Sequence, residues 1–333
     1  MTEIVSQGDR DLALGDEARR LLKKGVAENT RRGYGADRAT FNGWCAATGR
    51  TPLPATAQTL AEYVTALALA GLAPATIRRA MTSIRTMHQA AGLAPPVTKA
   101  ALTILRGYVR DGAPRAAPAD PLLIEDLRRL VETCDPDTVA GARDRALLVL
   151  GWTMMARRSE LAELDVEDVR VSHDWLRVTV RRSKTDQDGV GAVVEVPRGE
   201  HAETCPVRLV EAWLAVLGET TGPLFRPVDR HGRMGGDPRF AGRAKGARMA
   251  PQAVEVVMRR AVLRAGLTGA GAAGPRLTPH SMRAGGATQS YEDGASPLAI
   301  ARHGRWLDGS RVLLGYIRTV DKRRDNPMRR VGL

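Results

Sequence analysis

His280 and Arg283 lie three residues apart and follow Pro279, a residue that favours the first turn of a helix. At that spacing both side chains project from one face of the turn. An imidazole and a guanidinium beside the free backbone N–H groups of a helix start form a suitable site for a phosphoryl group. Because the H-x-x-R spacing is common by chance, this pair alone carries little weight.

A second basic pair follows a strongly apolar segment. Arg157 and Arg158 come after residues 146–155, and charge at the end of a buried segment is costly unless something uses it. Glu160 lies three residues after Arg157 and is placed to orient its guanidinium. Taken alone, the pair is better explained by a salt bridge at a helix end, and Arg158 is an alternative to Arg157.

Lys184 lies where a predicted strand runs into a hairpin turn. A lysine at a hairpin tip is ordinarily a solvated surface residue. In a phosphoryl-transfer enzyme, the same flexible ammonium can swing in and protonate a leaving oxygen. Both interpretations remain open when the hairpin is considered by itself.

A last cluster combines basic and aromatic residues near the end of the chain. Trp306 follows His303 in a basic run, and Tyr316 lies ten residues further on in a segment of high positive charge. Tyr316 is one of five tyrosines. Considered alone, it would be an ordinary packing residue on a late helix, so its significance depends on the other clusters.

The overall charge indicates a polyanionic partner. Lys plus Arg exceeds Asp plus Glu by 13, and the isoelectric point is near 10.4. Nucleic acid matches this surplus better than a membrane surface does, although a general arginine bias in composition would also produce it. No apolar run approaches the ~20 residues that span a bilayer, and no secretory signal is recognisable. We expect a cytoplasmic, nucleoid-associated protein without a membrane partner.

The cysteines give no indication of a metal site or of disulfide bonds. Cys45, Cys134 and Cys205 form no C-x-x-C pair. His201 precedes Cys205 by four residues, but no second pair lies nearby to complete a zinc site. The three residues are interpreted as reduced, buried thiols. Neither a metal nor a cofactor is predicted.

The pattern of apolar residues predicts two helix-rich domains joined by a linker. Residues 21–110 show helical spacing and follow a loose leader, residues 1–20. Residues 111–121 contain three prolines and a glycine, which favour an extended connector. Residues 122–333 form the second domain.

Part of the second domain has the period of β-strands instead. Residues 169–171, 176–180 and 193–196 are rich in β-branched side chains and are separated by turn-forming residues. This pattern predicts a small antiparallel sheet of three strands. The predicted fold class is therefore mainly α with a small antiparallel β-sheet (α+β).

Two further groups of basic residues are candidates for contact with DNA phosphates. Arg78, Arg79 and Arg85 lie on one predicted helix of the first domain. Arg243 and Lys245 lie in a Gly/Arg-rich loop of the second. A solvated helix face explains the first group about as well as phosphate contact does.

Together the four clusters are far more specific than any one of them. Their order, Arg…Lys…His-x-x-Arg…Trp…Tyr, resembles that of the tyrosine recombinase (phage integrase) family, whose hallmark is R-x-x-E-L, a β-hairpin Lys, H-x-x-R, a His or Trp, and a late Tyr. The resemblance covers most of the chain: a helical core-binding (SAM-like) domain would precede a catalytic domain. It implies a site-specific DNA recombinase that works through a 3′-phosphotyrosine, without metal or ATP.

The resemblance also assigns a role to each clustered residue. Tyr316 would attack phosphorus and release a 5′-hydroxyl, with Lys184 as the general acid. Two arginines would stabilise the transition state. These arginines match Arg157 and Arg283, and Glu160 matches the acid that supports Arg157. His280 would assist transfer of the tyrosine proton or orient the phosphate. Trp306 would pack in the site and donate its indole N–H to the phosphate.

One spacing departs from the family pattern. Trp306 lies ten positions before Tyr316, one more than the most familiar spacing, which implies a small insertion in the turn before the tyrosine helix. His303 is the alternative for the His/Trp position. The geometry of this turn is the part of the site that the sequence determines least.

The implied partners are two double-stranded DNA target sites, held by a homotetramer of Cre- and Xer-like two-domain subunits, and an accessory protein could join them. The 17 residues after Tyr316 are expected to pack onto a neighbouring subunit, and the leader is too short for a separate arm-site domain. Two other functions remain open: a monomeric enzyme similar to type IB topoisomerases, and a DNA-binding regulator that has lost turnover. The sequence does not distinguish integration, excision, inversion and dimer resolution.

Overall fold

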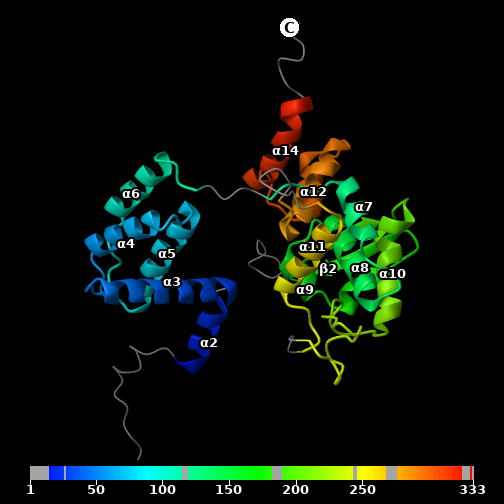
Figure 1. Cartoon of the computed structure of the whole chain (residues 1–333), viewed down its shortest axis with the longest axis horizontal. Helices are drawn as coiled ribbons and strands as arrows, with labels where there is room; N and C mark the ends of the chain where they lie inside the picture. Colours follow the sequence, from blue (N-terminus) through cyan, green and yellow to red (C-terminus); the bar gives the residue numbers. More distant parts are fainter. Residues whose placement is uncertain are drawn as a thin grey trace, which may run out of the picture. The chain divides into compact units, whose positions relative to one another are not determined.

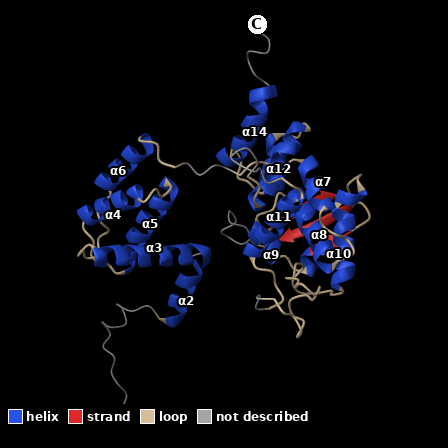
Figure 2. Cartoon of the chain, in the orientation of Figure 1, coloured by secondary structure: helices blue, strands red, loops and turns tan. Residues whose placement is uncertain are grey.

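The computed structural model folds into two compact units, Met1–Ala117 and Pro118–Leu333 (Figure 1). Helices dominate both, and the strands that are described lie in the second unit (Figure 2). The predicted fold class, mainly α with a small antiparallel sheet, is confirmed. No helix in the described part of the chain is both long and apolar enough to cross a membrane. The structure describes residues 15–25, 28–114, 119–181, 190–242, 246–267, 276–324 and 331.

The first unit is a helical bundle with an aromatic centre. Phe41 and Tyr63 meet edge to face, with ring centroids 4.9 Å apart. Ile77, Ile84 and Leu105 are buried around them. The helices that carry this core and its flank are α2 (Asp16–Gly25), α3 (Glu28–Ala47), α4 (Ala57–Leu69), α5 (Pro74–Ala90) and α6 (Lys99–Arg110).

Helix α2 begins at Asp16, inside the segment of residues 1–20 that was predicted to be a loose leader. Asp16 and Glu17 occupy its first turn, where negative charge is favoured by the helix dipole. Nε of Arg20 donates a hydrogen bond to Glu17 at 2.7 Å. The charged residues that obscured an apolar period thus stabilise this helix, and the prediction of a leader was wrong from Asp16 onwards.

The second unit is built around the buried helix α8. Residues 146–150 of this helix are fully buried, and α10 and α12 pack against it. The α-helices of this unit are α7 (Ile124–Glu132), α8 (Val139–Thr153), α9 (Arg158–Glu163), α10 (Pro206–Leu217), α11 (Pro251–Arg264), α12 (Pro279–Glu292), α13 (Pro297–Gly304) and α14 (Arg311–Arg324); the short 3-10 helices are η1 (Val166–Asp168) and η2 (Ala202–Thr204).

The predicted three-stranded sheet is present, and each strand bound lies within one residue of the expected one. It consists of β1 (Val169–Val171), β2 (Trp175–Val180) and β3 (Ala192–Pro197), all antiparallel, in the order β1-β2-β3. Val178 in the middle strand faces Val169 on one side and Val194 on the other. Leu176, Val178 and Val180 are buried while the residues between them are more exposed, as the period-two pattern requires.

Close packing fixes the start of helix α12 in the second unit. A Cβ on Gly285 would lie 1.8 Å from the carbonyl oxygen of Leu122, so only glycine allows this approach. The Leu122 N–H donates a hydrogen bond to the Ser281 carbonyl at 2.9 Å. The indole N–H of Trp152 on α8 donates to the Leu122 carbonyl at 2.7 Å. These contacts hold the first two turns of α12, which carry the predicted His–Arg pair.

Candidate active site

Helix α12 opens with the His280–Arg283 pair, as the sequence predicts. Thr278 is the N-cap, and its Oγ1 accepts a hydrogen bond from the His280 N–H at 3.2 Å. Pro279 occupies the first helical position. His280 is exposed, whereas Arg283, one turn further into the helix, is 2% exposed. The helix therefore presents one accessible imidazole and one buried guanidinium.

Tyr316 on α14 contacts this imidazole directly. Nε2 of His280 lies 2.5 Å from the Tyr316 hydroxyl, a short hydrogen bond. The two residues are 36 positions apart in the sequence and come from different helices. Partial desolvation of its ring lowers the pKa of His280 although the residue is exposed to solvent, and the charges of Arg283 and Arg157 lower it further. A neutral imidazole next to a phenol can accept the phenol proton.

The tyrosine itself is held in its protonated form. Burial raises the pKa of Tyr316 above its ordinary value, and the positive charge of Arg283 only partly opposes that rise. A nucleophilic phenolate would therefore have to be generated by transfer of the proton to a neighbour. His280 is in position to receive it.

The buried guanidinium of Arg283 lies flat against an aromatic ring. Its central carbon is 3.7 Å from the ring centroid of Trp306. Nη1 donates a hydrogen bond to the Met155 carbonyl, while Nη2 is buried without a hydrogen-bond partner among the described residues. A buried donor left unsatisfied is costly, so this N–H is available for an anion.

Trp306 reaches this position because of the glycine two residues before it. A Cβ on Gly304 would lie 1.9 Å from the Trp306 ring. The Trp306 N–H donates back to the Ala301 carbonyl at 2.8 Å, which turns the chain sharply at the end of α13. The ring then meets Tyr316 edge to face, with centroids 6.2 Å apart. The ten-residue spacing between the two residues is therefore compatible with ring contact.

Arg157 and Glu160 lie together at the start of α9. Glu160 is buried, and it accepts hydrogen bonds from the backbone N–H of Arg157 at 2.9 Å and from its guanidinium at 2.6 Å. A third donor, the guanidinium of Arg305, lies 2.7 Å from the same carboxylate. Burial alone would raise the pKa of Glu160, but Arg305 and Arg157 outweigh it and hold that pKa below its usual value.

Arg305 is a site residue that the sequence predictions missed. It stands in the basic run just before Trp306, but the run gave no reason to choose it among its neighbours. Its side chain is 7% exposed. The backbone of Arg305 has φ 60° at the end of α13, a left-handed conformation that favours glycine. An arginine at a helix end where glycine is usual is the one feature that could have singled it out.

The two alternatives left open by the sequence lie elsewhere. Arg158 is about half exposed and pairs with Glu255 on α11 at 2.8 Å. His303 donates through Nε2 to the Thr153 carbonyl at 2.7 Å. Neither side chain joins the cluster of Arg157, Glu160 and Arg283, so the geometry favours Arg157 and Trp306 for the two positions.

Comparison with known proteins identifies the family. A family model described as the phage integrase family matches residues 122–323, and one described as the phage integrase N-terminal SAM-like domain matches residues 19–93. The first match alone covers more than half of the chain.

The chain belongs to the phage integrase family. It is similar to an integrase/recombinase XerD homolog from Selenomonas ruminantium, with 30% identity over 319 residues, which cover 95% of this chain and 89% of that protein. Recombinase Cre of Escherichia phage P1 is 24% identical over 292 residues, with 84% and 80% covered. The predicted activity, that of a tyrosine-type site-specific DNA recombinase, is confirmed at the level of the family.

Solved structures of such recombinases share the fold. An integrase of the Tn1549 transposon, in complex with transposon right end DNA, superposes with a TM-score of 0.60 at 16% identity and covers 92% of this chain and 97% of that one. A lambda integrase fragment bound to a core site gives a TM-score of 0.59 at 14% identity, with 90% and 92% covered. Both neighbours are DNA complexes.

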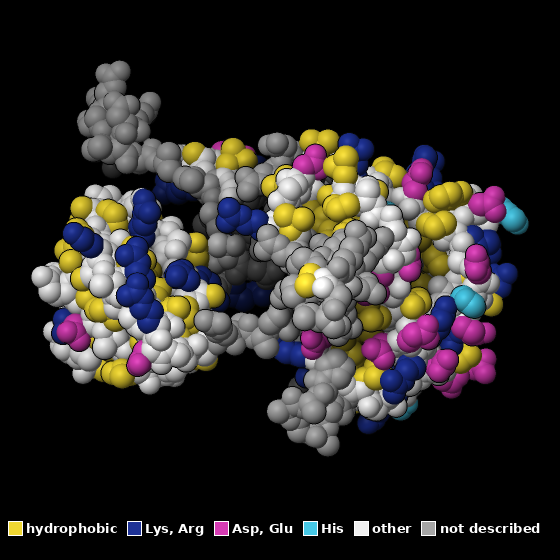
Figure 3. All heavy atoms as spheres, turned by 90° about the horizontal axis from the view of Figure 1, so that it is seen from above, with side chains coloured by type: hydrophobic (Ala, Val, Ile, Leu, Met, Phe, Trp, Pro, Cys, Tyr) yellow, Lys and Arg dark blue, Asp and Glu magenta, His cyan; other side chains and the backbone are white. Residues whose placement is uncertain are grey.

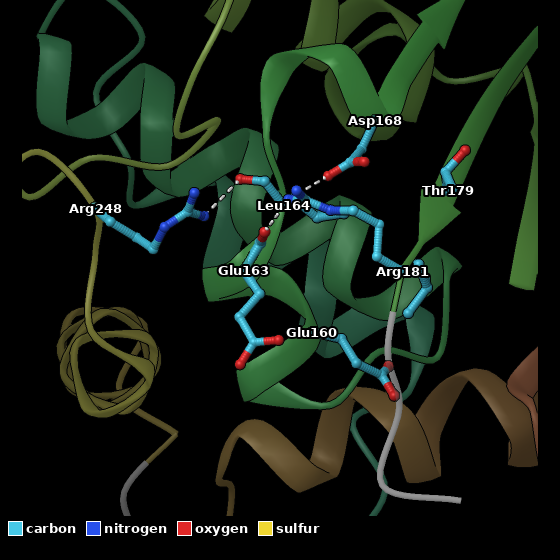
Figure 4. A pocket seen from close by; sticks show the side chains of 8 residues that line it. Glu160, Glu163, Leu164, Asp168, Thr179, Arg181 and Arg248 are labelled. Atoms are coloured by element: carbon cyan, nitrogen blue, oxygen red, sulfur yellow. Dashed lines mark hydrogen bonds and ion pairs between the residues drawn. The ribbon is translucent and has the colours of Figure 1, made fainter. Parts of the chain in front are cut away.

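In this tyrosine recombinase, Lys184 lies outside the described residues, whereas Arg181, three residues before it, is described. Arg181, directly after β2, donates to the Glu163 carbonyl at 2.9 Å and pairs with Asp165 and Asp168. Arg248 donates to the Leu164 carbonyl at 3.2 Å. Figure 4 shows the two guanidiniums approaching the end of α9 from opposite sides.

Asp168, Arg181 and Arg248 line a cavity of about 380 Å³, and Glu160 of the candidate active site also borders it. The pairing with arginine satisfies Asp165, whose pKa is held below its usual value by Arg248 and Arg181 against the opposing effect of burial. No group of three or more His, Cys, Asp or Glu in the described part of the chain is arranged to hold a metal ion.

The predicted DNA-contacting residues have different environments. Arg78 and Arg85 are exposed on α5, and Figure 3 shows Lys and Arg side chains gathered on one face of the first unit. Arg79 instead donates through Nε and Nη2 to the nearly buried Asp37 of α3, both at 2.9 Å. The Arg79 guanidinium would have to leave this ion pair between α5 and α3, or share it, in order to contact a DNA phosphate. Arg243 and Lys245 lie outside the described residues.

Proposed function

We propose that this tyrosine recombinase cleaves DNA through attack of the Tyr316 hydroxyl on a phosphodiester. A bond forms between Tyr316 Oη and phosphorus, and the bond from phosphorus to the 5′-oxygen breaks, which leaves a 3′-phosphotyrosine. The observation that carries the proposal is the 2.5 Å contact of Tyr316 with His280, close to a buried Arg283 N–H that has no protein partner among the described residues. The covalent bond conserves the energy of the phosphodiester, so a 5′-hydroxyl can reverse the step without ATP.

His280 would act as the general base in this step. Partial desolvation and the nearby arginines lower the pKa of its imidazole, which favours the neutral form, and its Nε2 is already hydrogen-bonded to the hydroxyl that must lose a proton. As Tyr316 attacks, the phenol proton passes to Nε2. The resulting imidazolium lies beside a phosphate whose negative charge compensates it.

Arg157 and Arg283 would bind the non-bridging oxygens of the scissile phosphate. Both guanidiniums are held by protein contacts before substrate arrives, Arg157 by Glu160 and Arg283 by Trp306 and the Met155 carbonyl. Such preorganised donors stabilise the charge of the transition state with little reorganisation. Trp306 would support this role by packing against Arg283.

Lys184 would protonate the departing 5′-oxygen. This part of the proposal rests on the sequence position of Lys184, three residues after Arg181, the last described residue of the hairpin's first arm. Arg181 is anchored to Asp165 and Asp168, so the hairpin leaves the sheet from a fixed point. A lysine ammonium can supply the proton that a departing oxygen takes up, which is the role we propose for Lys184.

Recombination would require four protomers on two duplexes, with the C-terminal segment of one protomer bound to the next. A groove of about 480 Å³ with largely apolar walls lies between α7, α12, α13 and the segment after β3. The residues after 324 include apolar Pro327, Met328, Val331 and Leu333. We place this segment of a neighbouring protomer in the groove. With DNA as substrate, the assembly would be found on the nucleoid.

Strand exchange between two labelled duplexes tests the function. A recombinase joins strands from different duplexes, whereas an enzyme similar to type IB topoisomerases relaxes supercoils without exchange, and a regulator without turnover does neither. We expect exchanged products in the absence of ATP. Relaxation without any exchange would contradict the assignment.

A further inference from the structure

Arg305 occupies a backbone position that an arginine rarely adopts. It follows Gly304, the last residue of α13, and has φ 60° and ψ 43°. Only Met155 shares a positive φ among the non-glycine residues that the structure describes. Glycine is the usual residue at such a helix end because it has no Cβ to clash. An arginine here therefore needs a compensating contact.

The Arg305 side chain supplies that contact within the catalytic cluster. Nη2 donates to Oε2 of Glu160 at 2.7 Å, and Nη1 donates to the Met154 and His303 carbonyls at 3.2 and 3.1 Å. The side chain is 7% exposed, and that of Glu160 is 2% exposed. The ion pair is thus shielded from solvent. Charge–charge interactions are stronger in such a buried environment than in water.

Glu160 is shared between two guanidiniums. Its Oε1 accepts from Nη1 of Arg157 at 2.6 Å, while its Oε2 accepts from the Arg157 backbone N–H at 2.9 Å and from Arg305. The Arg157 side chain is 19% exposed, more open than that of Arg305. Arg157 is therefore the arginine that remains accessible to a substrate, and Arg305 lies behind it.

We propose that Arg305 is a positioning residue that fixes the Glu160 carboxylate and, through it, the guanidinium of Arg157. The proposal rests on the function assigned above to Arg157. Without Arg305, the Glu160 carboxylate would lose its connection to the turn after α13 and could rotate toward Arg157 alone. Arg157 would then shift relative to the scissile phosphate.

Helix capping offers a simpler role, because Arg305 also donates to the His303 carbonyl at the end of α13. The two roles make different predictions. A cap affects the stability of α13 but does not depend on Glu160. A positioning residue affects cleavage only as long as Glu160 is a carboxylate that holds Arg157.

The test measures single-turnover formation of the covalent protein–DNA adduct on a nicked duplex. R305G removes the side chain and suits the left-handed backbone, and R305K retains the charge without the planar fork of donors. We expect R305G to slow adduct formation about 100-fold, the loss that a small misplacement of a catalytic group produces. R305K should restore part of the rate. R158A, which removes an exposed arginine from α9, the helix that carries Glu160, should match the unmodified protein.

A double-variant cycle separates positioning from capping. If Arg305 acts through Glu160, the variant that combines R305G with E160Q is no slower than E160Q alone. Fully multiplicative losses would overturn the proposal. The unmodified protein serves as the check on the assigned function: if it forms no adduct, the function fails, whereas normal adduct formation by R305G and R305K refutes only the role of Arg305.

A substrate without charge at the scissile position distinguishes a positioning role from a loss of protein stability, because a loss of stability would lower the rate equally on charged and uncharged substrates. A methylphosphonate at the scissile position lacks the negative charge that Arg157 neutralises. We expect the R305G defect to shrink on this substrate relative to the phosphodiester. An equal loss of rate on both substrates would show that Arg305 does not act through the charge-binding arginine.

Discussion

At the scale of single residues, the site combines groups whose protonation states suit their proposed roles. Partial desolvation and two neighbouring arginines lower the pKa of His280, which favours the neutral imidazole. Burial raises the pKa of Tyr316, so its phenol keeps its proton until the reaction. The acceptor and the donor of one proton are therefore already paired at 2.5 Å.

A pH profile tests this pairing. Only the neutral form of His280 can accept a proton, and that form predominates above its pKa. Because desolvation and the charges of Arg283 and Arg157 lower this pKa, the rate of adduct formation should fall only at a pH below that at which an ordinary imidazole takes up its proton.

The variant H280Q should lower this rate by about 100-fold or more, the usual contribution of a general base, and abolish the acidic fall. H173Q, which alters a histidine with an exposed side chain at a strand turn, is the matched control and should leave the profile unchanged. Retention of the acidic limb in H280Q would assign the titration to another group.

At the scale of elements, the junction between α13 and α14 brings the aromatic and basic groups together. Gly304 leaves room for the Trp306 ring, and Trp306 in turn supports Arg283. A left-handed residue such as Arg305 costs on the order of 1–3 kcal/mol. This cost is offset by the hydrogen bonds of Arg305 to Glu160 and two carbonyls.

The variant G304A tests this junction. The added Cβ would meet the Trp306 ring at 1.9 Å and force it away from Arg283. We expect a loss of about 1–3 kcal/mol in the free energy of unfolding, typical of overpacking, together with a marked fall in adduct formation. The measurements are thermal unfolding and single-turnover cleavage.

G315A is the matched control, because a Cβ on Gly315 meets nothing within 4 Å and the residue lies in helix α14. That change should be neutral or should stabilise the protein by up to about 1 kcal/mol. If G304A cleaves DNA normally, the Trp306–Arg283 contact does not matter for catalysis.

Local signals explain which elements the sequence could predict. The start of α12 follows from Thr278 and Pro279, and the sheet follows from alternating β-branched residues, so both predictions were correct. The roles of Arg79 and Arg305 depend on partners 42 and 145 positions away, Asp37 and Glu160. No local pattern indicates such pairs, and only the folded chain reveals them.

At the scale of the whole molecule, the surplus of 13 positive charges accounts for attraction to DNA. Individual arginines should nevertheless differ in their contribution. R78A and R85A remove exposed side chains of α5 and should each weaken DNA binding and reduce the slope of log affinity against log salt by about 1.

R79A should instead destabilise the first unit, because it leaves the nearly buried Asp37 without its bidentate partner. Fluorescence anisotropy at several salt concentrations and thermal unfolding distinguish the two effects. If R79A reduces the salt slope as much as R78A and leaves stability unchanged, the tie to Asp37 is not its main role.

Removal of residues 325–333 tests the proposed contact between protomers. The shortened chain retains Tyr316 and α14, so it should still bind a single site and form the covalent adduct. It should lose most of its strand exchange, because the groove of a neighbouring protomer would stay empty. Native gels of the DNA complexes measure assembly, and unchanged tetramer formation would refute this use of the segment.

The central claim is that Tyr316 becomes covalently linked to DNA, and one measurement tests it most directly. The protein is incubated with a nicked duplex that traps the cleaved state, the adduct is digested, and the modified peptide is identified by mass spectrometry. We predict a 3′-phosphate of DNA on Tyr316, and no adduct with Tyr316→Phe. An adduct on another residue, or undiminished adduct formation by Tyr316→Phe, would contradict the mechanism.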